Sequence, residues 1–254
     1  MIDIHSHIIP AVDDGSKDVE TSLEMLKIAH QDGTKILIAT PHFYRNRYEC
    51  NFSDIQNHIK NLNELAIEAD IDIKILPGQE IFLDKYSSDL YKSGTIGTIN
   101  NSRYMLVETS LVGVRPRDLM DNIYELKLLD VVPIIAHPER YEFVIKDNTE
   151  INDFIKEGCL FQITSTSITG GFGKEVKKTA ENLIKNGICN FIGSDAHTTG
   201  RRCPKIREAL EQIKNIDEGI YSSINKNSLS LINNEKLNIK MELIKKRKKL
   251  FPFW

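Results

Sequence analysis

Short apolar runs rich in β-branched residues alternate with longer amphipathic segments along most of this chain. Such alternation is typical of repeated βα units on a largely parallel sheet. Gly33, Gly158 and Gly187 each stand between an expected helix and the next strand, where a left-handed C-cap is favoured. The sequence therefore predicts an α/β fold, either a barrel or an open doubly wound sheet. Seven strands are predicted, near residues 4–7, 35–39, 73–76, 104–108, 132–136, 160–164 and 190–193.

The composition fits one sizeable domain and argues against several classes of protein. Of the 254 residues, 41% are hydrophobic and 27% are charged, which is enough apolar surface for a core. The net charge of −3 gives no positive excess for binding nucleic acid. The apolar runs, such as residues 131–136, are far shorter than the roughly 20 residues of a membrane-spanning helix. No basic region followed by an apolar segment opens the chain, so we expect a cytoplasmic protein.

The C-terminal end differs in charge from the rest of the chain. From Lys240 to Trp254, six basic residues accompany one acidic residue, which gives +5 and leaves −8 for the remainder. We therefore divide the chain into a domain at residues 1–235 and a basic, aromatic-ended tail at residues 236–254. Two roles are open for the tail: peripheral contact with anionic lipid, at about 1 kcal/mol per basic residue, or a disordered, solubilising end.

Residues of metal-ligand type follow six of the seven predicted strands. The carboxyl ends of parallel strands meet at one rim, so we expect these side chains to lie together. Any one of them alone is more often a cap or a turn residue, but burying the whole set without a cation would cost several kcal/mol. Imidazole and carboxylate without thiolate suit Mn²⁺, Fe or Zn²⁺. The set is His5, His7, Asp13, Asp14, His42, Glu80, Glu108, His137, Glu139, Asp195 and His197.

Other familiar catalytic motifs are absent from the sequence. No cysteine has an arginine six positions downstream, and the four cysteines form no C-x-x-C pair. The chain also lacks a Walker A loop and the G-x-G-x-x-G, H-E-x-x-H and G-x-S-x-G patterns. Water activated by a metal is the chemistry that remains.

These motifs resemble those of the PHP (polymerase and histidinol phosphatase) superfamily. Within it, the chain is most similar to the bacterial CpsB/CapC-type metal-dependent protein-tyrosine phosphatases of capsule and exopolysaccharide loci, from Met1 to about Asn227. The resemblance implies a distorted (β/α)7 TIM-like barrel with its metal site at the C-terminal rim of the strands. The segments that carry it are His5-Ser6-His7, Asp13-Asp14-Gly15, Thr40-Pro41-His42, Gly78-Gln79-Glu80, His137-Pro138-Glu139-Arg140 and Ser194-Asp195-Ala196-His197.

The resemblance also implies two or three divalent metal ions, with Mn²⁺ favoured and Fe or Zn²⁺ as alternatives. Arg140 and one of Arg201 and Arg202 would bind phosphate oxygens. Asp14 stands where some PHP proteins have a histidine, which matches the tyrosine-phosphatase branch. Carried over by position, the first metal would take His5, His7, Glu80 and Asp195, the second Glu80, Glu108 and His137, and the third Asp14, His42 and His197.

The activity implied by the resemblance is hydrolysis of phosphotyrosine by a metal-activated hydroxide, without a phosphoenzyme. The implied substrate is the tyrosine-rich tail of a bacterial tyrosine kinase that controls capsule or exopolysaccharide synthesis. Two alternatives stay open: a PHP-type phosphatase of a small metabolite such as histidinol phosphate, and a non-catalytic regulatory or interaction protein. The aromatic loop at residues 43–48 either lines the substrate site or packs locally. The sequence leaves the oligomeric state open.

Overall fold

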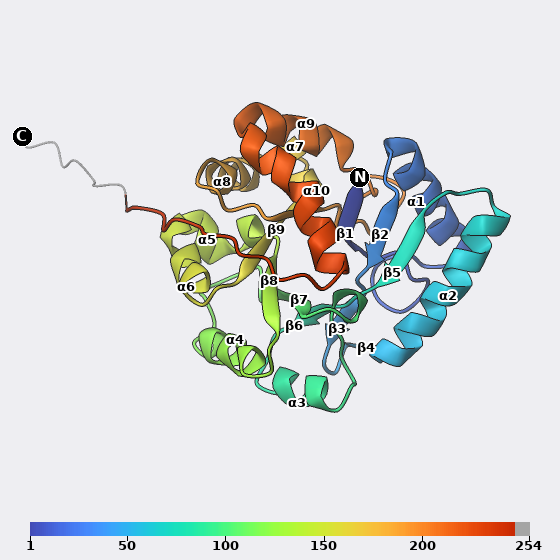
Figure 1. Cartoon of the computed structure of the whole chain (residues 1–254), viewed down its shortest axis with the longest axis horizontal. Helices are drawn as coiled ribbons and strands as arrows, with labels where there is room; N and C mark the ends of the chain where they lie inside the picture. The colour runs from blue at the N-terminus through green and yellow to red at the C-terminus, as the bar shows by residue number, and fades with distance from the viewer. Residues whose placement is uncertain (247–254) are drawn as a thin grey trace, which may run out of the picture.

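The computed structural model describes residues 1–246, and the last eight residues of the predicted tail lie outside this range. Parallel strands form its centre and helices pack around them (Figure 1). The strands are β1 (Ile2–Ser6), β2 (Ile36–Ala39), β3 (His42–Tyr44), β4 (Tyr48–Glu49), β5 (Lys74–Pro77), β6 (Glu80–Phe82), β7 (Tyr104–Glu108), β8 (Val132–Ala136), β9 (Leu160–Thr164) and β10 (Phe191–Gly193). The helices are α1 (Val19–Asp32), α2 (Phe52–Glu68), α3 (Ser87–Lys92), α4 (Leu119–Lys127), α5 (Glu142–Lys146), α6 (Ile151–Lys156), α7 (Ser165–Thr169), α8 (Lys174–Lys185), α9 (Arg207–Ile216) and α10 (Glu218–Ile232).

The strands form two sheets that follow one another around a distorted ring. One sheet has the order β1-β2-β5 and the other β10-β9-β8-β7-β6-β3-β4. The first and last strands meet, because Asp195 N donates to His5 O and His7 N donates to Ala196 O, both at 2.8 Å. Among the described residues β5 pairs only with β2, so the ring is not fully closed. The predicted α/β fold of TIM-like type is confirmed in this distorted form.

All seven predicted strands are present, together with three short strands that the sequence analysis did not predict. Strands β3 and β6 follow β2 and β5 after two-residue breaks, at residues 40–41 and 78–79. They pair with each other, so that His42 lies beside Glu80. Runs of two or three residues are too short to show a periodic pattern. At these breaks the chain passes from the three-stranded sheet to the seven-stranded sheet, and this brings His42 and Glu80 together.

The helix ends follow the expected glycine signals. The Asp18 side chain accepts the Thr21 amide at 2.8 Å and caps the start of α1. Gly33 ends this helix with φ 97°, and Gly158 and Gly187 have φ 75° and 78°. The three predicted left-handed caps are therefore confirmed, and each turns the chain from a helix into the next strand.

Residues 236–241 lie across the amino ends of β7, β8 and β9, at the end of the ring opposite the rim (Figure 1). The chain then reaches α6, where the Asn152 side chain donates to Ile244 O at 3.0 Å and accepts the Ile244 amide at 2.8 Å. Leu237, Ile239 and Met241 pack against the buried interior of the ring. The Tyr104 hydroxyl donates to Glu235 O at 2.6 Å and accepts the Leu237 amide at 2.9 Å. The division of the chain at residue 235 stays a prediction. Within residues 1–246, no helix combines the length and the hydropathy that crossing a membrane requires.

Candidate metal centre

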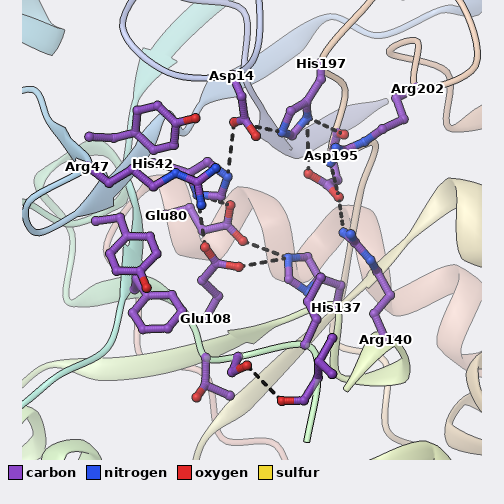
Figure 2. A pocket seen from close by; sticks show the side chains of 17 residues that line it. Asp14, His42, Arg47, Glu80, Glu108, His137, Arg140, Asp195, His197 and Arg202 are labelled. Carbon is purple, nitrogen blue, oxygen red and sulfur yellow. Dashed lines mark hydrogen bonds and ion pairs between the residues drawn. The ribbon is translucent and has the colours of Figure 1, made fainter. Parts of the chain in front are cut away.

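Nine predicted metal ligands converge on the carboxyl rim of the strands, and Figure 2 shows all of them except His5 and His7. Several line a pocket of about 350 Å³, and His5 and His7 are buried beneath it. The nine come from seven positions around the ring: β1 supplies His5, the segment after it His7 and Asp14, β3 His42, β6 Glu80, β7 Glu108, the end of β8 His137, and the segment after β10 Asp195 and His197. Residues spread over 193 positions of sequence are thus brought together by the strand ends.

The inner set, defined as His5, His7, Glu80 and Asp195, is fully buried. One ligand atom from each residue lies within 4.8 Å of the others. The Nε2 atoms of His5 and His7 are 3.1 Å apart, and each lies 3.1–3.2 Å from Glu80 Oε2. Two imidazole nitrogens and two carboxylate oxygens directed at one point are a donor set for a divalent cation.

The outer set, defined as His7, Asp14, His42 and His197, opens toward the pocket. Asp14 Oδ1 lies 3.5 Å from Nε2 of both His42 and His197. The Asp14 side chain is 45% exposed, whereas each member of the inner set is at most 1% exposed. The structure therefore adds His7 to the three residues that the resemblance groups here.

A third grouping joins the inner and outer sets. His42 Nδ1 lies 3.1 Å from Glu80 Oε2 and 3.0 Å from Glu108 Oε1. His137 Nε2 lies 2.8 Å from Glu80 Oε1 but 3.9 Å from Glu108 Oε2. The geometry thus gathers His42 more tightly than His137 around these two carboxylates, while the resemblance places His137 there. Glu80 contacts both of these histidines and is also a member of the inner set.

The protonation equilibria of the centre favour ionised carboxylates. Burial alone would raise the pKa of Glu80, but the charges on His5 and His42 outweigh it and hold that pKa well below its usual range. Burial would likewise raise the pKa of Asp195, and His5, His7 and the nearby arginines lower it further than burial raises it. Burial and the charge of His7 lower the pKa of His197 to about 4, which favours its neutral, ligating form. Burial alone would lower the pKa values of His5, His7 and His42, but the neighbouring carboxylates outweigh it and raise them. Because a metal binds neutral imidazole, a cation bound here would displace protons from these three rings.

The buried polar atoms fit bound cations. Glu80 Oε2 and His42 Nδ1 are buried and lie 3.1 Å apart, but within residues 1–246 neither atom makes a hydrogen bond of acceptable geometry. A buried carboxylate oxygen left in this way costs free energy unless a cation or donor reaches it. Both atoms face the shared centre of the groups above. The residues present therefore suit divalent metal ions.

A second layer orients the two innermost imidazoles. His7 Nδ1 and Asp13 Oδ2 are 2.7 Å apart, and the same oxygen accepts the His42 amide at 2.9 Å. His5 Nδ1 lies 2.9 Å from Gln162 Oε1. These contacts direct each Nε2 atom at the cluster, as outer-layer partners of metal-binding histidines do. Asp13 was among the residues of metal-ligand type in the sequence. The sequence analysis did not predict the orienting role of Asp13. It did not identify Gln162 at all, because inward-facing positions of β9 carry no distinct motif.

Two of the three predicted arginines reach the pocket. Arg140 Nη1 and Arg202 Nη2 lie 2.5 and 2.8 Å from Asp195 Oδ2. Asp195 thus turns one oxygen to the inner set and the other to the arginines. Arg201 instead donates to the Gly171 carbonyl and does not line the pocket. Between the two neighbours, the structure brings Arg202 to the site.

Phe172 contacts both of these arginines, and the sequence analysis did not identify it. Its ring centroid lies 4.5 Å from Arg140 Cζ and 5.9 Å from Arg202 Cζ, which is cation–π geometry. Phe172 stands in a turn between α7 and α8, where Gly170 and Gly173 have φ 90° and 98°. The run Gly170-Gly171-Phe172-Gly173 was the available sequence signal, because such φ values favour glycine.

The aromatic loop at residues 43–48 packs locally and also lines the pocket. Phe43 is buried in the core. Tyr44 stacks on Phe82 with centroids 4.1 Å apart, and Tyr48 stacks over His42 at 5.9 Å. Tyr44 and Tyr48 line the pocket, so this loop forms one wall of it.

Comparisons with known proteins agree with this geometry. The family model for capsular polysaccharide synthesis, CpsB/CapC, matches residues 1–235. The chain belongs to the CpsB/CapC family. The resemblance inferred from the six motifs is therefore confirmed.

Two curated CpsB/CapC relatives illustrate the extent of the likeness. The chain is 34% identical to the tyrosine-protein phosphatase YwqE of Bacillus subtilis, over 100% of both proteins. It is 32% identical to the putative tyrosine-protein phosphatase CapC of Staphylococcus aureus, over 94% of this chain and 93% of that protein. A crystal structure from work on YwqE of B. subtilis and CpsB of Streptococcus pneumoniae, described as unique metal-dependent tyrosine phosphatases, superposes with a TM-score of 0.91. This match covers 97% of this chain and 100% of the other, at 31% identity.

Proposed function

We propose that this chain is a metal-dependent protein-tyrosine phosphatase of capsule or exopolysaccharide synthesis. One observation carries the proposal: the buried imidazole and carboxylate cluster lies directly beside two arginines that share Asp195 Oδ2, in a single pocket. This arrangement combines cation ligands with guanidinium donors suited to a phosphate ester. The names of the relatives, which are tyrosine phosphatases, support the same activity.

The cysteines do not favour the alternative of a thiolate nucleophile. Among the residues that line the pocket there is no cysteine. Burial raises the pKa of Cys159 to about 12 and also raises the pKa of Cys189. A thiol with such a pKa is protonated near neutral pH and is a poor nucleophile. Metal-assisted hydrolysis is therefore the better fit to this site.

The chain's own residues would bind and orient the substrate. The inner and outer sets, with Glu108 and His137, would hold the cations, which when bound supply Lewis-acid stabilisation and lower the pKa of water. Arg140 and Arg202 would donate to the non-bridging phosphoryl oxygens. The wall formed by Tyr44 and Tyr48 would lie along the aromatic ring of the substrate. A phenolate leaving group, with a pKa of about 10 for its phenol, departs more readily than an alkoxide and depends less on protonation by a general acid.

Several finer features belong to the same proposal. The donor set of nitrogen and oxygen atoms supports two or three ions, with Mn²⁺ first and Fe or Zn²⁺ as alternatives. The physiological substrate would be the tyrosine-rich tail of a bacterial tyrosine kinase. The enzyme would work in the cytoplasm, at the inner face of the membrane where that kinase lies. The basic residues after position 239 support such peripheral contact with anionic lipid.

The test is hydrolysis by the purified full-length protein of three substrates: a phosphotyrosine peptide, the matched phosphoserine peptide and histidinol phosphate. Each is measured with Mn²⁺ and with a chelator. We expect preference for phosphotyrosine and loss of turnover on chelation. Preference for histidinol phosphate would contradict the proposal and favour a metabolite phosphatase. Absence of turnover by metal-loaded protein would favour a non-catalytic interaction protein.

A further inference from the structure

Arg47 extends along the aromatic wall of the pocket, across the centre from Arg140 and Arg202 (Figure 2). It stands in the turn between β3 and β4. Its Cζ atom lies 5.0 Å from the ring centroid of Tyr48 and 5.9 Å from that of Tyr44. Both contacts are cation–π in geometry, and they hold a long, exposed side chain in an extended position at the pocket mouth.

The charge of Arg47 is not neutralised within residues 1–246. No carboxylate of that part of the chain lies within 4.0 Å of its guanidinium nitrogens. Arg45, two residues earlier in the same turn, differs in this respect. Its Nε donates to Asp84 Oδ2 at 2.9 Å, and its guanidinium lies over Tyr86, outside the pocket lining. The hairpin therefore carries one arginine with a partner in the protein and one directed at the pocket.

The position of Arg47 suits a contact with the polypeptide around the phosphorylated residue. Arg140 and Arg202 already lie on the opposite side, next to Asp195. A chain whose phosphotyrosine enters between the two sides would pass over Tyr44 and Tyr48 and meet Arg47 at the mouth. The rest of this protein carries −8 outside its last fifteen residues, so an acidic segment needs local positive charge to approach.

We infer that Arg47 is a specificity-determining residue that binds the carboxylate of an acidic residue adjacent to the phosphotyrosine. This inference rests on the proposed phosphatase function and names the class of substrate: phosphotyrosine in an acidic sequence. Arginine stacked on tyrosine is preorganised, so less rotamer freedom is lost when a carboxylate binds to its planar donor fork.

The test compares two phosphotyrosine peptides that differ only at the neighbouring positions, one with glutamate and one with glutamine. The readout is the ratio of their kcat/KM values, measured with the metal-loaded full-length protein. For the unaltered protein we expect a ratio above one that falls as salt rises. In Arg47→Ala the ratio should fall roughly fivefold, as for loss of one exposed charge pair. In Arg47→Glu the glutamine peptide should become the better substrate.

Arg45→Ala is the matched control, because it removes one positive charge from the same hairpin. We expect it to keep the ratio of the unaltered protein. An equal loss for both peptides in Arg47→Ala would overturn the inference, since Arg47 would then act on the phosphate or on the hairpin itself. An equal fall of the ratio in Arg45→Ala would also overturn it, in favour of a general field effect. Failure of the phosphatase proposal is distinct, because neither peptide would then be hydrolysed by the unaltered protein.

Discussion

The inner and outer sets of the metal centre use the same residue types in different surroundings. His5 and Glu80 of the inner set have no exposed side-chain surface, whereas Asp14 of the outer set is 45% exposed. Buried ligands compete with little water and are held by the second layer at Asp13 and Gln162. Ligands at the pocket leave room for solvent and substrate, as catalytic metal sites require. We therefore expect the inner set to bind a cation more tightly than the outer set.

Glu80→Gln is the substitution with the largest expected effect. Glu80 contacts His5, His7, His42 and His137, so the neutral amide weakens both the inner set and the group formed by His42, Glu80 and Glu108. We expect loss of bound metal and a fall in phosphotyrosine turnover of at least about a hundredfold. Metal content by elemental analysis and steady-state kinetics measure both effects. Normal metal content with normal turnover would show that the inner set is not part of the machinery.

Asp14→Asn is the matched change in the outer set, because it also replaces a carboxylate by an amide of similar shape. Asp14 contacts His42 and His197 of the outer set. The one member of the inner set that is grouped with Asp14 is His7, which belongs to both sets. We expect roughly tenfold lower turnover, recovered in part by excess metal, with the inner ion retained. Loss of all metal in this variant would show that the two sets bind metal as a single unit. It would contradict the distinction between an inner and an outer set.

Phe172→Leu should have the smallest effect of the three. The leucine keeps an apolar side chain but removes the ring faced by Arg140 and Arg202. Loss of about 0.5–1 kcal/mol per exposed cation–π contact predicts a KM for phosphotyrosine peptide that is several-fold higher, with metal content unchanged. Phe172→Tyr should restore KM. A lower kcat with unchanged KM would contradict the positioning role of this ring.

The sequence predicted much of this centre because strand ends are visible in it. The run from Ile4 to His7 and the apolar stretch before His137 showed where strands end, and parallel strands place those ends at one rim. The choice between Arg201 and Arg202 could not be made, because neighbouring residues in a loop point in directions that only tertiary contacts fix. The grouping of His42 with Glu80 depends on β3 and β6, which are too short to predict.

The most direct measurement of the central claim is metal content and phosphotyrosine turnover in the same samples, during stepwise removal of metal by a chelator. The account predicts two or three divalent ions per chain at the start. It also predicts that turnover falls as the first ions leave, while a more tightly held ion remains with the inactive protein. Readdition of Mn²⁺ should restore the activity. Full turnover by protein stripped of metal would contradict the account.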